Sequence, residues 1–222
     1  MSHDPEDEGG DAPCFAHHLV GGHPVAPETA RDVARFRKGA RARLLEARKL
    51  STPDRDAALA GLRVGLEKRI RITKGVRIAA YWPIRAEPDL RGWMKAVHSA
   101  GAQILLPVVA GKSAPLEFHH WSPGCRMTRG VWNIPVPADG APDRPDIVIS
   151  PLLGVDHAFY RLGNGGGYYD RTLAALDPRP HVIGVGLAGC MLPTIYPMPW
   201  DIPMDEIILS DGTMRQRAGD RA

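Results

Sequence analysis

The sequence has few cysteines and no long hydrophobic run. Its 222 residues contain only three cysteines, Cys14, Cys125 and Cys190, which are widely separated and form no CxxC pair. This argues against zinc or CxxC redox chemistry, so we expect three reduced thiols, with a disulfide pair as the less favoured alternative. No apolar run approaches the roughly 18 to 20 residues of a membrane span. The acidic start lacks the features of a signal peptide, which predicts a cytoplasmic protein without membrane association.

The chain also lacks a strong net charge. Lys and Arg number 28 against 25 Asp and Glu, a formal charge of +3 that does not by itself argue for nucleic acid. The basic residues are dense between residues 31 and 77, however. That local excess suits a phosphorylated small ligand as well as RNA, and a solvated helix face explains it equally well.

The first part of the chain predicts an extension followed by two helices. Residues 1–28 are acidic and then rich in Gly, His and Pro, which predicts a flexible N-terminal extension, with a single domain over 29–222. The second helix is predicted from an N-cap at Ser51 or Thr52 to about residue 72, with Leu59, Leu62, Leu66 and Ile70 buried. The first is predicted over 28–50, with basic residues opposite an apolar face of Val33, Phe36, Ala40, Leu44, Ala47 and Leu50.

Beyond Gly75, short apolar runs alternate with helical patterns. Because each run is almost uninterrupted, we predict a mostly parallel sheet covered on both faces, in a three-layer, Rossmann-like α/β fold with a helical N-terminal arm. The predicted strands cover residues 76–82, 103–109, 116–121, 146–150, 181–187 and 206–210, and further helices cover 89–100 and 168–176.

A glycine-rich segment, RLGNGGGYYD at 161–170, precedes the last predicted helix. Its four glycines allow backbone N–H groups to approach an anion, while the helix N-terminus and Arg161 add positive charge. The segment is neither a P-loop nor a GxGxxG fingerprint, so from the glycines alone a flexible turn and a phosphate cradle both remain open.

Polar and aromatic neighbours favour the cradle. Tyr168 and Tyr169 offer rings for stacking, and Asp170 suits either the helix dipole or Mg²⁺ on a nucleotide phosphate. Asp201 could be a second metal ligand, or its side chain could simply form an Asx turn. Glu87, after the strand at 76–82, and Trp132, in a loop, lie where a substrate could bind, although a loop Glu is usually solvated.

Together these segments resemble the 5-formyltetrahydrofolate cyclo-ligase family over roughly residues 30 to 212. The resemblance rests on a basic first helix and on four motifs. They are YWPIRAEPDL at 81–90, GVWNIPVP at 130–137, RLGNGGGYYDR at 161–171 and LPTIYPMPWDIPMD at 192–205.

The resemblance implies an ATP- and Mg²⁺-dependent enzyme that converts 5-formyltetrahydrofolate into 5,10-methenyltetrahydrofolate and releases ADP and phosphate. The formyl oxygen would be phosphorylated, N10 would attack the activated carbon, and phosphate would leave. The expected partner is a reduced folate, with no nucleic acid, and the chain is expected to be monomeric.

The resemblance also assigns residues. Arg161 and Tyr169 are expected to act in catalysis, and Asp170 and Asp201 to hold Mg²⁺. The predicted folate pocket consists of Trp82, Glu87, Trp132 and Tyr168. The predicted nucleotide site consists of Arg37, Lys38, Arg41, Arg161, Leu162, Gly163, Asn164, Gly165, Gly166, Gly167, Tyr168 and Tyr169.

Three residues depart from the pattern of the family. Asn164 stands where relatives commonly have Tyr or Arg, Gly166 where some have Lys, and Trp200 where a polar residue is frequent. Two other readings therefore stay open. One is a paralogue acting on another, thiamine-related substrate, and the other is a non-catalytic nucleotide- or RNA-binding module.

Overall fold

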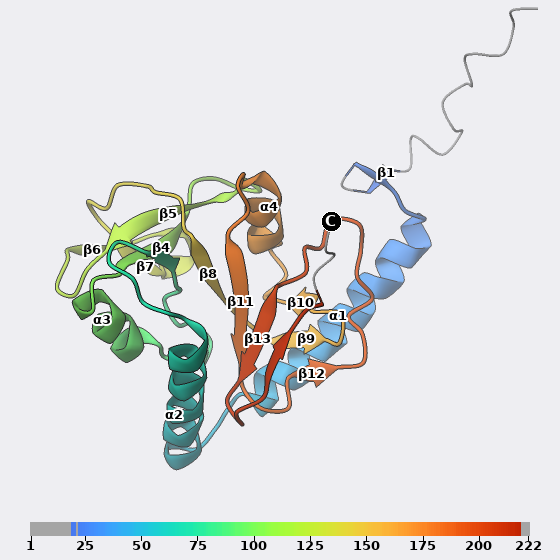
Figure 1. The fold of residues 1–222 in the computed structure, drawn as a ribbon. Helices are drawn as coiled ribbons and strands as arrows, with labels where there is room; N and C mark the ends of the chain where they lie inside the picture. The colour runs from blue at the N-terminus through green and yellow to red at the C-terminus, as the bar shows by residue number, and fades with distance from the viewer. Residues whose placement is uncertain (1–18, 21, 219–222) are drawn as a thin grey trace, which may run out of the picture.

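The computed structural model describes residues 19–20 and 22–218, so the structure of most of the predicted extension lies outside it (Figure 1). These described residues form four α-helices: α1 (Pro27–Ala47), α2 (Thr52–Arg69), α3 (Arg91–Ser99) and α4 (Tyr168–Ala175). The helix α1 begins at Pro27, inside the predicted extension, and is preceded by the hairpin of β1 (Leu19–Val20) and β2 (His23–Pro24).

A seven-stranded sheet forms the centre of the molecule, in the order β14-β13-β11-β8-β3-β4-β5. The five inner strands pair in parallel, while the edge strands β5 and β14 are antiparallel. The prediction of an α/β fold with a mostly parallel sheet is therefore confirmed. The strands are β3 (Arg77–Ala79), β4 (Gln103–Val109), β5 (Leu116–Trp121), β8 (Ile147–Pro151), β11 (His181–Gly186), β13 (Glu206–Leu209) and β14 (Met214–Gln216).

The chain order of the five parallel strands contains one reversal. Counted along the sequence, their order in the sheet is 2-1-3-4-5, and the reversal lies between β3 and β8. At such a point the connections leave the carboxyl ends of neighbouring strands in opposite directions, which opens a crevice at that edge. Residues after β3 and residues after β8 therefore meet there.

Each face of the sheet carries its own hydrophobic cluster, because successive side chains of a strand point to opposite sides. Ile78 and Ile149 pack on one face with Leu66 of α2 and Met94 of α3. On the other face, Val148 and its neighbours pack with Leu173 of α4, among others. Figure 1 shows the same division, with α2 and α3 on one side and α4 on the other.

Several short strands were not predicted from the sequence, because strands of two or three residues carry no detectable periodicity. The strands β9 (Gly154–Asp156), β10 (Arg161–Leu162) and β12 (Met191–Leu192) form a small sheet. A second small sheet joins β6 (Met127–Arg129) to β7 (Pro135–Pro137), flanking a 3-10 turn at Val131–Asn133. Among the described residues, no helix is both long and apolar enough to cross a membrane.

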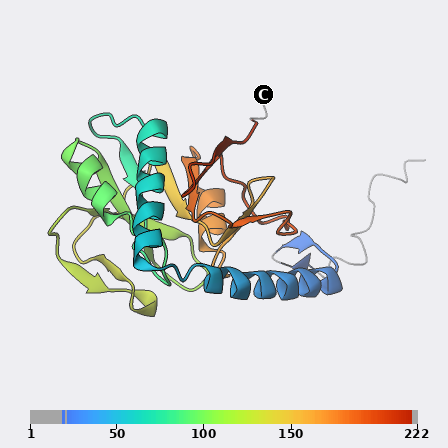
Figure 2. The ribbon, with the colours of Figure 1, turned by 90° about the horizontal axis from the view of Figure 1, so that it is seen from below.

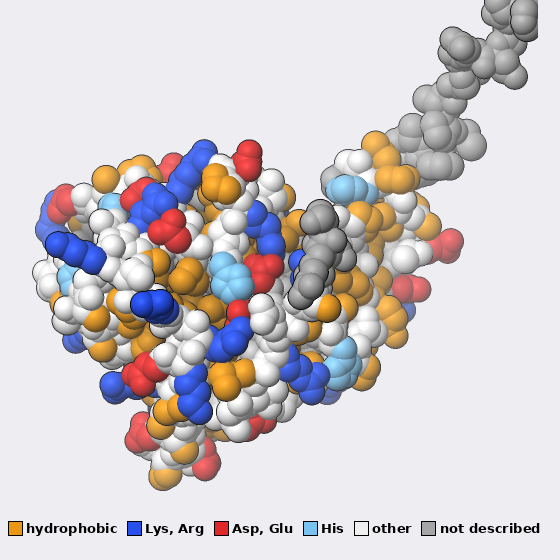
Figure 3. Space-filling view, in the orientation of Figure 1, with side chains coloured by type: hydrophobic (Ala, Val, Ile, Leu, Met, Phe, Trp, Pro, Cys, Tyr) orange, Lys and Arg blue, Asp and Glu red, His pale blue; other side chains and the backbone are white. Residues whose placement is uncertain are grey.

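Helix α1 lies along the small sheet and differs from its predicted pattern. Ala40 packs with Leu162 and Ile195, but Phe36 and Ala47, expected on the apolar face, are exposed. Figure 2 shows the first part of α1 extending beyond the body of the molecule, which accounts for the exposure of Phe36; Ala47 is the last residue of the helix. Figure 3 shows hydrophobic atoms at the surface along this helix. The inward face instead includes arginines, which matters for the site.

Candidate nucleotide and substrate site

The candidate site lies where the carboxyl ends of β3 and β8 meet. Glu87 is in the connection after β3, and the glycine-rich segment follows β8 through the β9–β10 hairpin. Leu162, at the end of β10, is buried against Ala40 and Ile195. Because its side chain anchors the strand in the core, the glycines begin at a fixed point and run directly into α4.

The glycine loop, defined here as residues 163–167, has a conformation that requires glycine. Gly165 and Gly167 have φ of +100° and +63°, where side chains with a Cβ are strained. Gly167 is the N-cap of α4 and supplies no side chain to cap it. The backbone N–H groups of residues 164 to 170 donate no hydrogen bond to any described residue. A loop with this many open donors at a helix N-terminus is suited to an anion.

Arginine side chains surround this loop. The Arg41 guanidinium of α1 donates from Nε to the Gly163 carbonyl at 2.8 Å, and Arg171 of α4 donates from Nη2 to the Gly166 carbonyl at 2.6 Å. The guanidinium of Arg161 lies close to Gly163. Burial, followed by the nearby charge of Arg37, lowers the pKa of Arg41. Such crowding of like charges is favourable only when an anion compensates it.

Arg161 connects the loop to the sheet and to α4. It donates to the hydroxyl of Ser150 at 3.1 Å and pairs with Asp170 at 3.1 Å, and its guanidinium lies 4.6 Å from the centre of the Tyr169 ring. The Tyr169 hydroxyl is buried and has no hydrogen-bond partner among the described residues. Burial raises the pKa of Tyr169, so this hydroxyl stays protonated at neutral pH and is a donor in search of an acceptor.

Asp201 is paired with the first helix. Both of its oxygens accept from Arg37, at 2.5 and 3.2 Å, and it also accepts from the Met198 backbone N–H at 2.6 Å. Arg37 further donates to the carbonyls of Ile195 and Tyr196. Asp201 therefore holds its own loop against α1, a role that the sequence did not indicate.

The two aspartates suit a metal ion that is held jointly by protein carboxylates and ligand phosphates, rather than one enclosed by protein ligands alone. The Ile202 N–H donates to Asp170 at 3.3 Å, so the residue next to Asp201 contacts the other carboxylate. Among residues 19–20 and 22–218, no group of three or more His, Cys, Asp or Glu could hold a metal. Mg²⁺ commonly uses only one or two carboxylates together with ligand phosphates, and each carboxylate here retains acceptor capacity.

Glu87 is a buried carboxylate, although loop glutamates are usually solvated. Its Oε2 accepts from the Ile84 backbone N–H at 3.1 Å, and its Oε1 lies 3.4 Å from the Asn164 amide of the glycine loop. Arg48 lies 3.9 Å away, and both side chains are 4% exposed. Burial raises the pKa of Glu87, while Arg48 opposes this rise. Asn164, which departs from the pattern of the family, thus joins the glycine loop to Glu87.

Aromatic side chains stand at the mouth of the site. Trp132 is 65% exposed, has a φ of 54°, and packs edge-on against the Tyr168 ring at 5.5 Å. A large exposed ring held in a strained backbone conformation is characteristic of a binding surface. Trp82 lies against the core and under the guanidinium of Arg91.

The structure brings most, but not all, of the predicted residues together. Lys38 is exposed on α1, and Leu162 contributes backbone only, since its side chain is in the core. Two residues were missed: Arg171 at the loop and Arg48 beside Glu87. Arg37, Arg41 and Arg48 recur at a spacing of 4 and 7, which puts them on one face of α1, and this spacing could have revealed Arg48.

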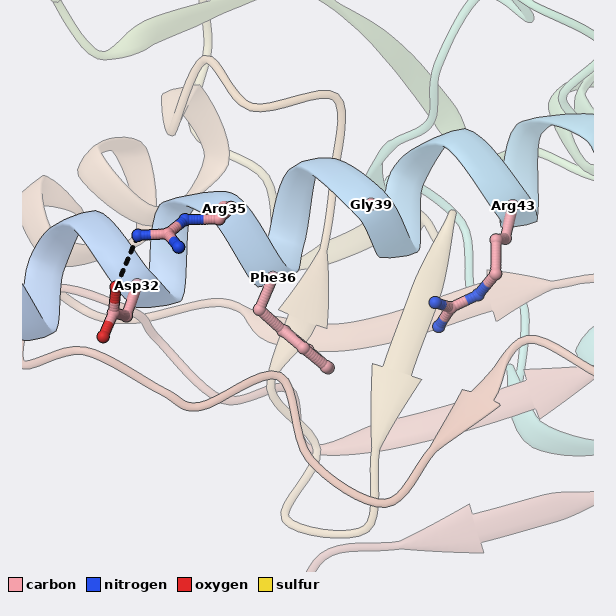
Figure 4. Close-up of a pocket in the computed structure, with 5 residues that line it drawn as sticks. All are labelled: Asp32, Arg35, Phe36, Gly39 and Arg43. Carbon is pink, nitrogen blue, oxygen red and sulfur yellow. Dashed lines mark hydrogen bonds and ion pairs between the residues drawn. The ribbon is translucent and has the colours of Figure 1, made fainter.

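A separate hollow of about 390 Å³ runs along the outer face of α1. Figure 4 shows its lining, with Arg35 paired to Asp32 and the ring of Phe36 projecting from the helix. None of the predicted site residues lines it, so it is distinct from the candidate site.

Comparison with known proteins identifies related chains. The model of the 5-formyltetrahydrofolate cyclo-ligase family matches residues 33–210. A 5-formyltetrahydrofolate cyclo-ligase of Mycolicibacterium smegmatis is 32% identical over 143 residues, which cover 60% of this chain and 73% of that protein. The protein of the same name from Escherichia coli K12 is 31% identical over 139 residues, covering 59% and 76%.

Solved structures agree with these matches. The 5,10-methenyltetrahydrofolate synthetase of Aquifex aeolicus superposes with a TM-score of 0.72 at 26% identity, covering 84% of this chain and 95% of the other. The synthetase of Mycoplasma pneumoniae, at 22% identity and a TM-score of 0.63, covers 78% and 97% and shares the fold.

Proposed function

The chain belongs to the 5-formyltetrahydrofolate cyclo-ligase family, and we propose that it converts 5-formyltetrahydrofolate into 5,10-methenyltetrahydrofolate with hydrolysis of ATP to ADP and phosphate. One observation carries the proposal beyond family membership. The glycine loop with its open N–H groups touches Glu87 through Asn164, so an anion site and a buried carboxylate share one crevice. A reaction between a nucleotide and a folate requires such a junction.

The glycine loop is the proposed phosphate site. Its N–H groups and the guanidinium groups of Arg41 and Arg161 would bind phosphate oxygens, as charge-assisted hydrogen bonds are the strongest available. Arg171 belongs to the same set, because its guanidinium lies against the loop at Gly166. Arg37 and Lys38 are proposed to reach the nucleotide from α1. Of the two, only Arg37 contacts residues around the loop, through Asp201.

Asp170 and Asp201 are the proposed Mg²⁺ ligands. When bound, the ion neutralises charge on the phosphates during transfer. The proposal is best supported for Asp170, which opens the helix beside the loop and also fixes Arg161. Asp201 would have to share its carboxylate between the ion and Arg37.

The proposed folate pocket uses Trp82, Glu87, Trp132 and Tyr168. A pterin ring offers adjacent N–H donors, and a buried carboxylate such as Glu87 is the acceptor that pairs with them in a bidentate manner. The exposed Trp132 ring beside Tyr168 supplies an apolar surface for a planar ligand.

Catalysis in this proposal rests on positioning and electrostatics, and no side chain acts as a nucleophile. The formyl oxygen of the folate is the acceptor of the phosphoryl group, which turns a poor leaving group into a good one. Arg161 is held by Ser150 and Asp170 beside the loop, where negative charge develops. The Tyr169 hydroxyl, buried and unpaired among the described residues, is available to donate to the reacting oxygen.

We infer that the fold is Rossmann-like, with α1 as an arm over the site, because the 2-1-3-4-5 strand order is typical of doubly wound sheets. A small-molecule folate is the proposed partner. The monomeric state, the absence of nucleic acid and the cytoplasmic location stay predictions.

The test is a direct assay with purified protein, 5-formyltetrahydrofolate, ATP and Mg²⁺. We expect the near-ultraviolet absorbance of the methenyl product to appear together with one ADP for each product. Each reagent omitted in turn serves as a control. Binding of the folate without product would contradict the enzymatic proposal and favour a binding module.

A further inference from the structure

We propose that Arg48 is a positioning residue that keeps Glu87 ionised and oriented for the folate ring. The inference rests on the proposed function, because it concerns the carboxylate assigned to the pterin. The spacing of Arg37, Arg41 and Arg48 puts Arg48 on the inward face of the first helix, but nothing in the sequence indicates that it lies beside Glu87.

The geometry separates two parts of the Arg48 guanidinium. Arg48 is the C-cap of α1, and its Nη2 donates to the Leu152 carbonyl after β8 at 2.6 Å. Its Nη1 points to Glu87 Oε1 at 3.9 Å, and is buried without a hydrogen-bond partner among the described residues. Nη2 therefore fixes the side chain, while Nη1 faces Glu87 without a hydrogen-bond partner among the described residues.

Little room for water remains beside the two side chains. The cavity beside them measures about 10 Å³ and is bounded by apolar side chains such as Leu59 and Leu187. A single water needs about 10 to 15 Å³, so at most one can enter. Low hydration leaves the attraction between guanidinium and carboxylate weakly screened.

The charge is needed because Glu87 is otherwise destabilised as an anion. Burial raises its pKa, and the hydrogen bond from the Ile84 backbone N–H opposes this rise most. Arg48 and the more distant Arg161 are the cations that oppose it further. The hydroxyls of Tyr81, which donates to the Pro88 carbonyl, and Tyr169 lie near enough to interact with Glu87. Burial raises the pKa of both, so neither adds charge at neutral pH. Arg48 is consequently the nearest compensating charge.

Other groups near Arg48 do not replace it. Burial raises the pKa of the Cys190 thiol to about 12, which keeps the thiol neutral. Arg55 also borders the cavity, but it is exposed and donates to the Leu50 carbonyl. Asn164 donates a neutral hydrogen bond only. Removing the charge of Arg48 should therefore favour the protonated form of Glu87, which is a poorer acceptor for pterin donors.

The test measures 5-formyltetrahydrofolate binding to the full-length protein without ATP, by tryptophan fluorescence, from about pH 6 to about pH 9. Arg48→Gln should weaken binding by up to about 10-fold, with the largest loss at the acidic end of this range, because a pKa rise of one unit on Glu87 lowers its ionised fraction most where the pH lies below the pKa. The loss should shrink as the pH rises, because Glu87 then ionises without help. Arg48→Lys should bind within about 3-fold of the wild type, since it retains the charge.

A double-mutant cycle separates positioning from structure. Adding Arg48→Gln to Glu87→Gln should cause no further loss of folate binding. A loss in Arg48→Gln that is the same at every pH, or that persists in the Glu87→Gln background, overturns the proposal. If Arg48→Gln fails to fold, Arg48→Lys is the test variant. A pH-independent loss of folate binding in Arg48→Lys that is as large as the loss in Glu87→Gln overturns the proposal. Wild-type protein that binds no folate overturns the proposed function, and this inference with it.

Discussion

The glycine loop can be tested with one substitution and a matched control. Gly165→Ala adds a Cβ at φ +100°, about 3.4 Å from the Arg41 guanidinium carbon. Gly212→Ala adds the same group at φ +88° in the turn before β14, where no atom lies within 4 Å. Both variants carry similar backbone strain, but only the first changes the surroundings of the proposed phosphate site.

The expected magnitudes follow from this difference. Strain at positive φ costs about 1–2 kcal/mol in either variant, which for a chain of this size lowers Tm by about 2–8 °C. In Gly165→Ala the added Cβ also lies in close contact with the Arg41 guanidinium, so a change of the loop backbone that relieves the strain disturbs the 2.8 Å bond from Arg41 to Gly163. Misplaced donors of this kind reduce kcat/KM for ATP about 10- to 100-fold.

The assay compares kcat and KM for ATP and for 5-formyltetrahydrofolate, with Tm measured on the same samples. We expect Gly212→Ala to lose stability but keep wild-type kinetics at a temperature well below its Tm. Gly165→Ala should lose ATP turnover with little change in folate KM. Equal kinetics in the two variants would refute the assignment of the loop as a phosphate site.

Further predictions concern the carboxylates and their partners. Asp170→Asn should lower kcat about 100-fold while folate affinity stays within about 2-fold, because only phosphate transfer needs the ion; equal losses in both, measured by kinetics and binding, would contradict the metal assignment. Burial makes the pKa of Glu87 higher in the folded protein than in the unfolded chain. The free energy of unfolding therefore decreases as the pH rises from the unfolded-state pKa through the folded-state pKa. Thermal unfolding should therefore show Glu87→Gln gaining Tm relative to wild type between acidic and neutral pH, and a constant difference would argue against this. Arg37→Met should cost about 3 kcal/mol by leaving Asp201 unpaired, and adding Asp201→Asn should restore part of it in urea unfolding. Asn164→Ala removes one hydrogen bond to Glu87, so folate Kd should rise about 2- to 10-fold in titration calorimetry, with ATP binding unchanged in the absence of folate.

The inner strands of the sheet were predictable because their physics is local. The strand at 103–109 was predicted with the bounds of β4, since a buried parallel strand is a continuous apolar run. An N-cap was predicted at Ser51 or Thr52, and the structure has Ser51, whose side chain accepts from the Asp54 N–H. The strand predicted at 76–82 is shorter, with β3 ending at Ala79, because the chain then turns into the connection that carries Glu87.

Most of the individual site residues could be predicted from the sequence, but their arrangement in space could not. Gly163–Gly167 and Asp170 stood out through conformational freedom and charge, which are properties of short segments. Periodicity predicted that Phe36 would be buried, and it is exposed, because only the fold determines how far α1 extends beyond the core. Periodicity puts Arg48 on the same face as Arg37 and Arg41, but it gives no sign that Arg48 lies beside Glu87.

The sequence by itself determined the α/β character of this protein, its glycine loop and the set of candidate binding and catalytic residues. Only the tertiary structure decided which of these residues meet. Glu87 and Asn164 are 77 positions apart and come together because the strand order reverses between β3 and β8. Arg48 acquires a role only because the end of α1 is buried beside that same crevice. Contacts between distant segments depend on packing, and no local pattern encodes them.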